Sequence, residues 1–194
     1  MYASEYWNDR YVREDTPWDT GEPVPPLHRI ISGLNQRDIR ILIPGAGRGY
    51  EAILLRSMGF QNVYVCDWAV QALDALRQKD MDFPEDHLLC GDFFALELQV
   101  DLILEHTFFC AIPRSMRIPY VQKAHQLLNS GGAIAGLLFS REFEAPGPPF
   151  GGSEEEYRSL FSPHFAIREL TPALDSIAPR LGSELQFRFE KRGV

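Results

Sequence analysis

The chain has 194 residues, of which 45% are hydrophobic and 24% charged, and its formal net charge is −8. This balance is ordinary for a globular protein, and the length favours one domain over residues 1–194. No Lys/Arg-rich segment supplies the positive surface that nucleic-acid phosphates need, so nucleic acid is not an expected partner.

The sequence contains no apolar run near the roughly 20 residues that a membrane span requires. The first ten residues lack the basic start and apolar centre of a signal peptide. The three cysteines, Cys66, Cys90 and Cys110, show no CxxC spacing, so neither a disulfide framework nor a metal site is expected. We therefore expect a cytoplasmic protein without metal or membrane partner, and a monomer as the simplest state.

A charged N-terminal segment carries three large aromatic residues, Trp7, Tyr11 and Trp18. Trp7 and Tyr11 are four residues apart, so in a short helix they share one face. The prolines of the stretch "TPWDTGEPVPP" cannot continue a helix, which places Trp18 on an extended segment. We predict that residues 1–26 form a lid over a ligand. The alternative is that these aromatic side chains only pack against the edge of the core.

From residue 39 onward, short apolar segments alternate with helical patterns. Strands are predicted at 39–44, 62–67, 86–92, 100–106, 131–140 and 184–191, and helices at 50–59, 69–79, 115–129 and 153–161. Near-continuous apolar strands that alternate with helices predict an α/β core, residues 39–194, with a parallel sheet covered on both faces.

Two of these elements carry additional signals. The last strand alternates, with Leu185, Phe187 and Phe189 on one face, which is typical of an edge or antiparallel strand. The last helix is preceded by Ser153, with Glu156 three residues later, which predicts a capping box.

The loops at the carboxyl ends of the strands are the candidate site, because ligands of parallel α/β sheets bind there. The first loop, "PGAGRGY", places Gly45, Gly47 and Gly49 between a strand and a helix, where the backbone is able to approach a ligand closely. Tyr50 stands where the dinucleotide fingerprint has its last glycine, which disfavours NAD or FAD and favours a mononucleoside-type ligand. The alternative is a simple tight turn.

Polar and aromatic residues follow the next two strands. Asp67 lies about twenty residues beyond the glycines, where a carboxylate binds ribose hydroxyls, although it is equally suited to cap the next helix. Trp68 either offers a flat surface for an adenine or is an ordinary aromatic residue of the core or the protein surface. Asp92 is able to accept a hydrogen bond from an exocyclic amine, and Phe93 to present its ring or its backbone N–H to a base.

Six motifs together resemble the thiopurine methyltransferase superfamily, and most of all its halide and thiol methyltransferase branch. In chain order they are "YWNDRY", "TPWDTGEPVP", "LIPGAGRGYEA", "GDFF", "FFCAIPRSMR" and "APGPPF". The resemblance implies a Rossmann-like class I methyltransferase fold, with a mostly parallel seven-stranded sheet between helices and an antiparallel C-terminal strand. It also implies S-adenosylmethionine as the methyl donor.

The resemblance assigns residues to the donor site. Donor contacts are implied at Trp7, Tyr11, Trp18, Gly45, Asp67, Asp92, Phe93 and His106, to which the loops themselves add Gly47 and Trp68. His106 matches the position that faces donor and acceptor, where thiopurine enzymes have Arg and halide enzymes Tyr, so the acceptor stays open. Tyr11 stands where relatives often have Trp, and Ala46 replaces a common Cys.

The expected activity is methyl transfer from S-adenosylmethionine to a small soft nucleophile: a thiol, hydrosulfide, halide or heterocyclic thiol. Such nucleophiles need no base. His106 is nevertheless the candidate catalytic residue, either with Glu105 as a pair that removes a thiol proton or as a residue that shapes the pocket. The proline-rich segment 141–150 is expected to wall the acceptor pocket, where Arg141 either attracts an anion or faces water.

Two other functions are compatible with the same fold. One is a nicotinamide-dependent oxidoreductase, which the glycine spacing disfavours. The other is a non-catalytic nucleoside-binding module.

Overall fold

The computed structural model describes residues 4–193, so residues 1–3 of the predicted lid and Val194 lie outside the described residues. Within this range seven strands form one sheet in the order β3-β2-β1-β4-β5-β7-β6. The strands are β1 (Ile41–Pro44), β2 (Val63–Asp67), β3 (Leu88–Cys90), β4 (Val100–Glu105), β5 (Leu128–Phe139), β6 (Phe165–Pro172) and β7 (Glu184–Lys191). The α-helices are α1 (Ser4–Val12), α2 (Pro25–Ser32), α3 (Tyr50–Ser57), α4 (Val70–Lys79), α5 (Arg117–Leu127) and α6 (Glu154–Phe161). Short 3-10 helices are η1 (Glu85–His87), η2 (Phe93–Ala95), η3 (Arg114–Met116) and η4 (Ala178–Arg180).

The sheet is parallel except at its C-terminal end. Strands β1 to β5 pair in parallel, with Ile41 of β1 opposite Val63 of β2 and Leu102 of β4. Strand β7 pairs antiparallel with both β5 and β6. The predicted mostly parallel seven-stranded sheet with an antiparallel C-terminal strand is therefore confirmed.

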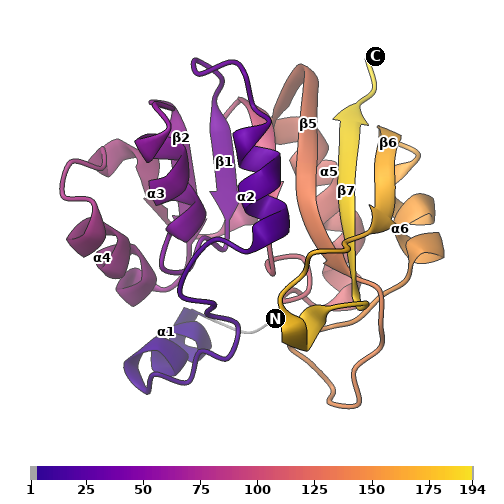
Figure 1. The fold of residues 1–194 in the computed structure, drawn as a ribbon, viewed down its shortest axis with the longest axis horizontal. Coiled ribbons are helices and arrows are strands. Elements are labelled where there is room, and N and C mark those ends of the chain that lie inside the picture. Colours follow the sequence, from indigo (N-terminus) through magenta and orange to yellow (C-terminus); the bar gives the residue numbers. More distant parts are fainter. Residues whose placement is uncertain (1–3, 194) are drawn as a thin grey trace.

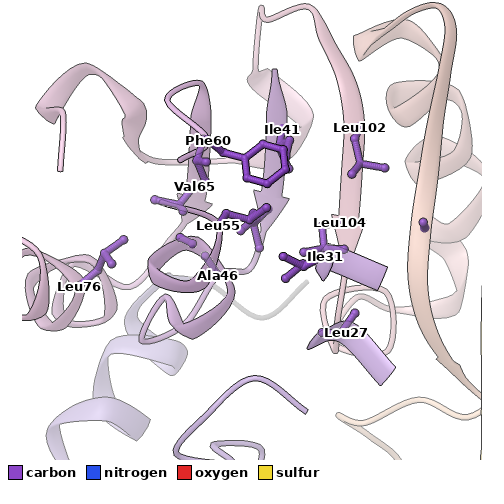
Figure 2. Close-up of a cluster of buried hydrophobic side chains, with 14 of the residues drawn as sticks. Leu27, Ile31, Ile41, Ala46, Leu55, Phe60, Val65, Leu76, Leu102 and Leu104 are labelled. Atoms are coloured by element: carbon purple, nitrogen blue, oxygen red, sulfur yellow. The ribbon is translucent and has the colours of Figure 1, made fainter. Parts of the chain in front are cut away.

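Helices cover both faces of the sheet (Figure 1). Helices α2, α3 and α4 contribute to one hydrophobic core, and α5 and α6 to the other. Figure 2 shows side chains of the first core, to which α2 contributes Leu27 and Ile31. In β1, Ile41 and Ile43 belong to this core and Leu42 to the opposite one. Because both sides of β1 are buried, its sequence is apolar throughout.

Most predicted elements agree with the structure. The predicted strands and helices after residue 39 each correspond to one observed element, with ends that differ by at most three residues. The Ser153 N-cap of the predicted capping box is confirmed, since its hydroxyl accepts a hydrogen bond from the Glu156 N–H at 3.2 Å, while the Glu156 carboxylate pairs with Arg117. None of the described helices is long and apolar enough to cross a membrane.

Helix α2 and strand β6 were not predicted. Helix α2 begins with Pro25 and Pro26, and prolines fit there because the first N–H groups of a helix have no acceptor within it. Strand β6 forms the outer edge of the sheet, so β7 lies between β5 and β6. The prediction that β7 is antiparallel is confirmed, but it is not an edge strand.

Helix α1, the loop after β5 and η4 gather at the edge where the parallel strands end (Figure 1). Helix α1 is attached to α4, because the Asn8 side-chain oxygen accepts a hydrogen bond from the Val70 N–H at 3.1 Å. Ala69, at the start of α4, has no side chain that could cap this helix. Asn8 therefore satisfies one of the open N–H groups of a helix that is far away in the sequence.

Candidate active site

A cavity of about 350 Å³ opens at the carboxyl ends of the parallel strands. One side, which we call the glycine-loop half, is lined by Trp7, Tyr11, Trp18, Gly45, Asp67, Trp68, Asp92 and Phe93. The other side, the Arg180 half, is lined mainly by Thr107, Cys110, Ile112, Phe139, Arg141, Phe143, Pro148, Pro149, Pro179 and Arg180. Eight of the ten predicted donor contacts thus share one cavity, and Gly47 and His106 are not among the residues that line it.

The glycine loop leaves room that a larger residue would remove. Gly45 has a φ of +59°, and a Cβ there would lie 2.7 Å from the ring of Phe108. Gly47 has a φ of +54°, and a Cβ there would lie 3.0 Å from the Tyr11 hydroxyl. Both positions therefore require glycine for conformation and for space. Tyr11 of helix α1 therefore packs closely against this loop.

Asp67 is held at the tip of β2 by two backbone hydrogen bonds. Its Oδ2 accepts from the Gly47 N–H at 2.9 Å, and its Oδ1 accepts from the Ala69 N–H at 2.8 Å. Burial raises the pKa of this carboxyl, and the N–H groups oppose that shift. The Trp68 N–H also interacts with this carboxylate, which lines the cavity and keeps acceptor capacity for a ligand. Gly47 thus contributes by fixing Asp67.

Asp92 and Phe93 follow β3. Asp92 accepts a hydrogen bond from the Phe94 N–H at 2.9 Å and so starts η2. The Phe93 side chain is only 2% exposed and stacks on Tyr120 with ring centroids 5.3 Å apart. Because one side of its ring is covered by the core, Phe93 forms a fixed wall of the cavity.

The N-terminal aromatic residues meet one another over the glycine loop. Trp18 packs edge-on against Trp7 and Tyr11, with centroid distances of 5.5 and 5.9 Å. Burial raises the pKa of the Tyr11 hydroxyl, which keeps it protonated. An ion pair of 2.6 Å between Asp19 and Arg48 links the segment after Trp18 to the glycine loop.

Glu105 is turned away from the cavity. It is fully buried, and its Oε1 accepts hydrogen bonds from the Phe108 and Phe109 N–H groups at 2.9 and 2.8 Å. Its Oε2 accepts from the Tyr120 hydroxyl at 2.6 Å. With these contacts Glu105 holds the loop after β4 in place. The suggested Glu105–His106 pair does not form, because Glu105 is engaged elsewhere.

The buried Glu105 gives the stability of the protein a pH dependence. Burial raises the pKa of Glu105 from 4.5 to about 7. Folding therefore favours the protonated form of Glu105. The stabilisation of the folded state that results is fully present below pH 4.5 and is lost as the pH rises through about 7. We expect the Tm of the wild-type protein to fall relative to that of Glu105→Gln between pH 5 and 8, in calorimetric scans. A difference in Tm that does not change with pH would contradict this assignment.

His106 lies beside the cavity, between two charged residues. Its Nδ1 is 3.5 Å from Glu51 Oε1, and its Nε2 is 3.0 Å from Arg180 Nη1. The imidazole is 12% exposed. The structure therefore brings His106 next to the cavity-lining Arg180, and not to the cavity wall itself.

Arg180 is the principal polar residue that the sequence did not predict. It lies on η4, its side chain is 11% exposed, and it lines the cavity. The loop between β6 and β7 that contains it shows no motif or periodicity, so no local signal identifies it. The predicted wall formed by segment 141–150 does line the cavity, through Arg141, Phe143, Pro148 and Pro149.

The fold and the cavity define a class of enzyme. A mostly parallel sheet with β7 inserted antiparallel, a glycine loop after β1 and a carboxylate after β2 are the features of Rossmann-like S-adenosylmethionine-dependent methyltransferases. The fold is similar to that of the 1,6-didemethyltoxoflavin-N1-methyltransferase of Burkholderia thailandensis, solved with bound S-adenosylhomocysteine, at a TM-score of 0.75. The two chains are 18% identical, over 98% of this chain and 87% of the other.

The chain belongs to the thiopurine S-methyltransferase family, whose model matches residues 2–191. It is 29% identical to a probable thiol methyltransferase 2 of Arabidopsis thaliana, over 97% of this chain and 86% of that relative. It is 27% identical to a thiopurine S-methyltransferase of Vibrio vulnificus, over 98% and 96% of the two chains. The protein is thus an S-adenosylmethionine-dependent methyltransferase, as the sequence motifs predicted, and the oxidoreductase and nucleoside-binding alternatives are set aside.

Proposed function

We propose that this methyltransferase acts on small, soft nucleophiles, with thiols and hydrosulfide ahead of halides. The observation that carries the proposal is the composition of the Arg180 half of the cavity. Among the described residues that line this half there is no carboxylate and no histidine, whereas the guanidinium groups of Arg141 and Arg180 lie among apolar walls. An alcohol acceptor needs a base to remove its proton, but a thiolate or halide needs none.

The glycine-loop half fits the methyl donor. Asp67 has free lone pairs that suit two ribose hydroxyls, and Asp92 suits an exocyclic amine. Trp68 and Phe93 provide flat and fixed apolar walls for a base. Trp7, Tyr11 and Trp18 cover this half, and aromatic faces stabilise a neighbouring cation by roughly 0.5–2 kcal/mol. S-adenosylmethionine supplies a methyl group on a positively charged sulfur, which is an activated leaving group.

The Arg180 half suits an anionic acceptor. The Arg180 guanidinium is poorly hydrated at 11% exposure, which strengthens its attraction for an anion, while Glu184 at 3.5 Å offsets part of its charge. The positive charge of Arg180 acts to lower the pKa of a thiol in this half, against the opposing effect of burial. Phe139, Phe143 and the prolines exclude water, and the cavity aligns acceptor and donor.

The protein has a thiol of its own in this half of the cavity. Cys110 donates a hydrogen bond to the Thr107 carbonyl at 3.1 Å, and burial raises its pKa to about 12. The thiol therefore stays protonated near neutral pH. We conclude that Cys110 does not compete with an added thiolate for the methyl group.

An acceptor panel tests the proposed function. The protein is incubated with S-adenosylmethionine and hydrosulfide, alkyl and heterocyclic thiols, halides, phenols or amines. Mass spectrometry then measures the methylated products and S-adenosylhomocysteine. We expect methyl thioethers as the main products, with slower formation of methyl halides. Turnover confined to oxygen or nitrogen acceptors would contradict the proposal.

A further inference from the structure

His106 contacts Arg180 in a way that indicates which ring nitrogen accepts a hydrogen bond. The distance from His106 Nε2 to Arg180 Nη1 is 3.0 Å, within hydrogen-bond range. A guanidinium has only donors, so Nε2 must be the acceptor and carry no proton. The proton of the neutral ring then resides on Nδ1, which lies 3.5 Å from Glu51 Oε1. The basic nitrogen of His106 is therefore occupied by Arg180.

Arg180 is oriented by partners from four parts of the chain. Besides His106 after β4, its Nη2 donates to the Trp18 carbonyl at 3.3 Å, and its Nη1 lies 3.5 Å from Glu184 Oε1 of β7. Its guanidinium carbon lies 5.7 Å from the centroid of the Phe139 ring of β5. A planar guanidinium with these contacts keeps one orientation, and loses little further freedom when an anion binds.

We propose that His106 is a positioning residue, whose unprotonated Nε2 holds the Arg180 guanidinium in place for the acceptor anion. This inference rests on the proposed function, since Arg180 is taken as the group that binds the acceptor. It gives His106 no part in removing a thiol proton. His106 is half-buried beside the cavity, and its Nε2 faces Arg180 and not an acceptor in the cavity.

Two substitutions of His106 separate positioning from base catalysis. His106→Gln retains a side-chain acceptor for Arg180 but has no titratable group, whereas His106→Ala removes both. Thiocyanate, an anion that carries no proton to remove, serves as the probe. Its affinity for the protein saturated with S-adenosylhomocysteine is measured by calorimetry, and methyl transfer to a thiol is measured in parallel. Arg180→Met serves as the reference for loss of the guanidinium, and His87→Ala as a control.

We expect His106→Ala to bind thiocyanate about tenfold more weakly than the wild type, because one hydrogen bond to a charged group is lost. Arg180→Met, which lacks the guanidinium, should bind thiocyanate no more tightly than His106→Ala. His106→Gln should stay within about threefold of the wild type in both assays. His87 lies against Tyr64, with ring centroids 4.0 Å apart, and its variant should bind thiocyanate as the wild type does.

Other results would overturn the inference. Wild-type affinity for thiocyanate in His106→Ala, or no thiocyanate binding by the wild type, rules out positioning. If His106→Gln and His106→Ala lose thiol turnover equally while both bind thiocyanate normally, His106 is a base. If the wild type methylates no soft nucleophile but the variants still bind thiocyanate in the expected order, the proposed function fails while the positioning role stands.

Discussion

Replacing Asp67 with alanine is expected to weaken the binding of S-adenosylhomocysteine about ten- to hundredfold. The Asp67 carboxylate lines the glycine-loop half and keeps acceptor capacity beyond its backbone hydrogen bonds. Hydrogen bonds to a charged group contribute about 1.5–3 kcal/mol, which corresponds to that loss of affinity. Titration calorimetry measures the dissociation constant, and circular dichroism checks that the variant is folded.

A matched control separates ligand binding from local structure, because Asp67 also holds the Gly47 and Ala69 N–H groups. Asp101 similarly accepts hydrogen bonds, from the Arg40 N–H at 2.8 Å and from Asn129 at 2.8 Å, but it does not line the cavity. Asp101→Asn should bind S-adenosylhomocysteine with the affinity of the wild type, whereas Asp67→Asn should bind it more weakly. Equal affinity in Asp67→Ala and the wild type would remove Asp67 from the ribose site.

Deleting residues 1–20 is expected to leave a folded sheet that binds S-adenosylhomocysteine at least about tenfold more weakly. Helix α1 contributes no buried residue, so its loss leaves both hydrophobic cores intact. The deletion removes Trp7, Tyr11 and Trp18 from the cavity, and with them the apolar cover that excludes water. The same deletion removes the Trp18 carbonyl from Arg180, so acceptor binding should weaken as well.

Two measurements on the full chain complement the deletion. Ligand binding should change tryptophan fluorescence, because Trp7, Trp18 and Trp68 line the cavity, and should protect the segment before Pro23 from protease. Asn8→Ala removes the bond to the Val70 N–H and should reduce this protection. Asp9→Ala changes an exposed neighbour on the same helix and should not. A truncated protein that is folded and binds with full affinity would show that the aromatic residues serve packing only.

The sequence by itself determined the glycine-loop half of the cavity. A buried strand, a run of glycines and a helix are local patterns, and Asp67 is identified by its place at the end of the next strand. The Ser153 cap and the alternation in β7 are equally local, because each depends on residues a few positions apart. Such signals survive without tertiary contacts, since backbone conformation and side-chain periodicity are set by neighbours in the chain.

In the Arg180 half the sequence predicted the wall formed by residues 141–150, but only the tertiary structure decided the place of Arg180. Arg180 contacts His106 and Trp18, which are 74 and 162 residues away in the sequence. No sequence pattern near Arg180 predicts either contact. The orientation of His106, in the loop after β4, also depends on Glu51 of α3, and the interior place of β7 depends on pairing with β6. The chemistry of these side chains is set by their partners in space, because a hydrogen bond fixes a histidine's tautomer whatever the sequence distance between donor and acceptor.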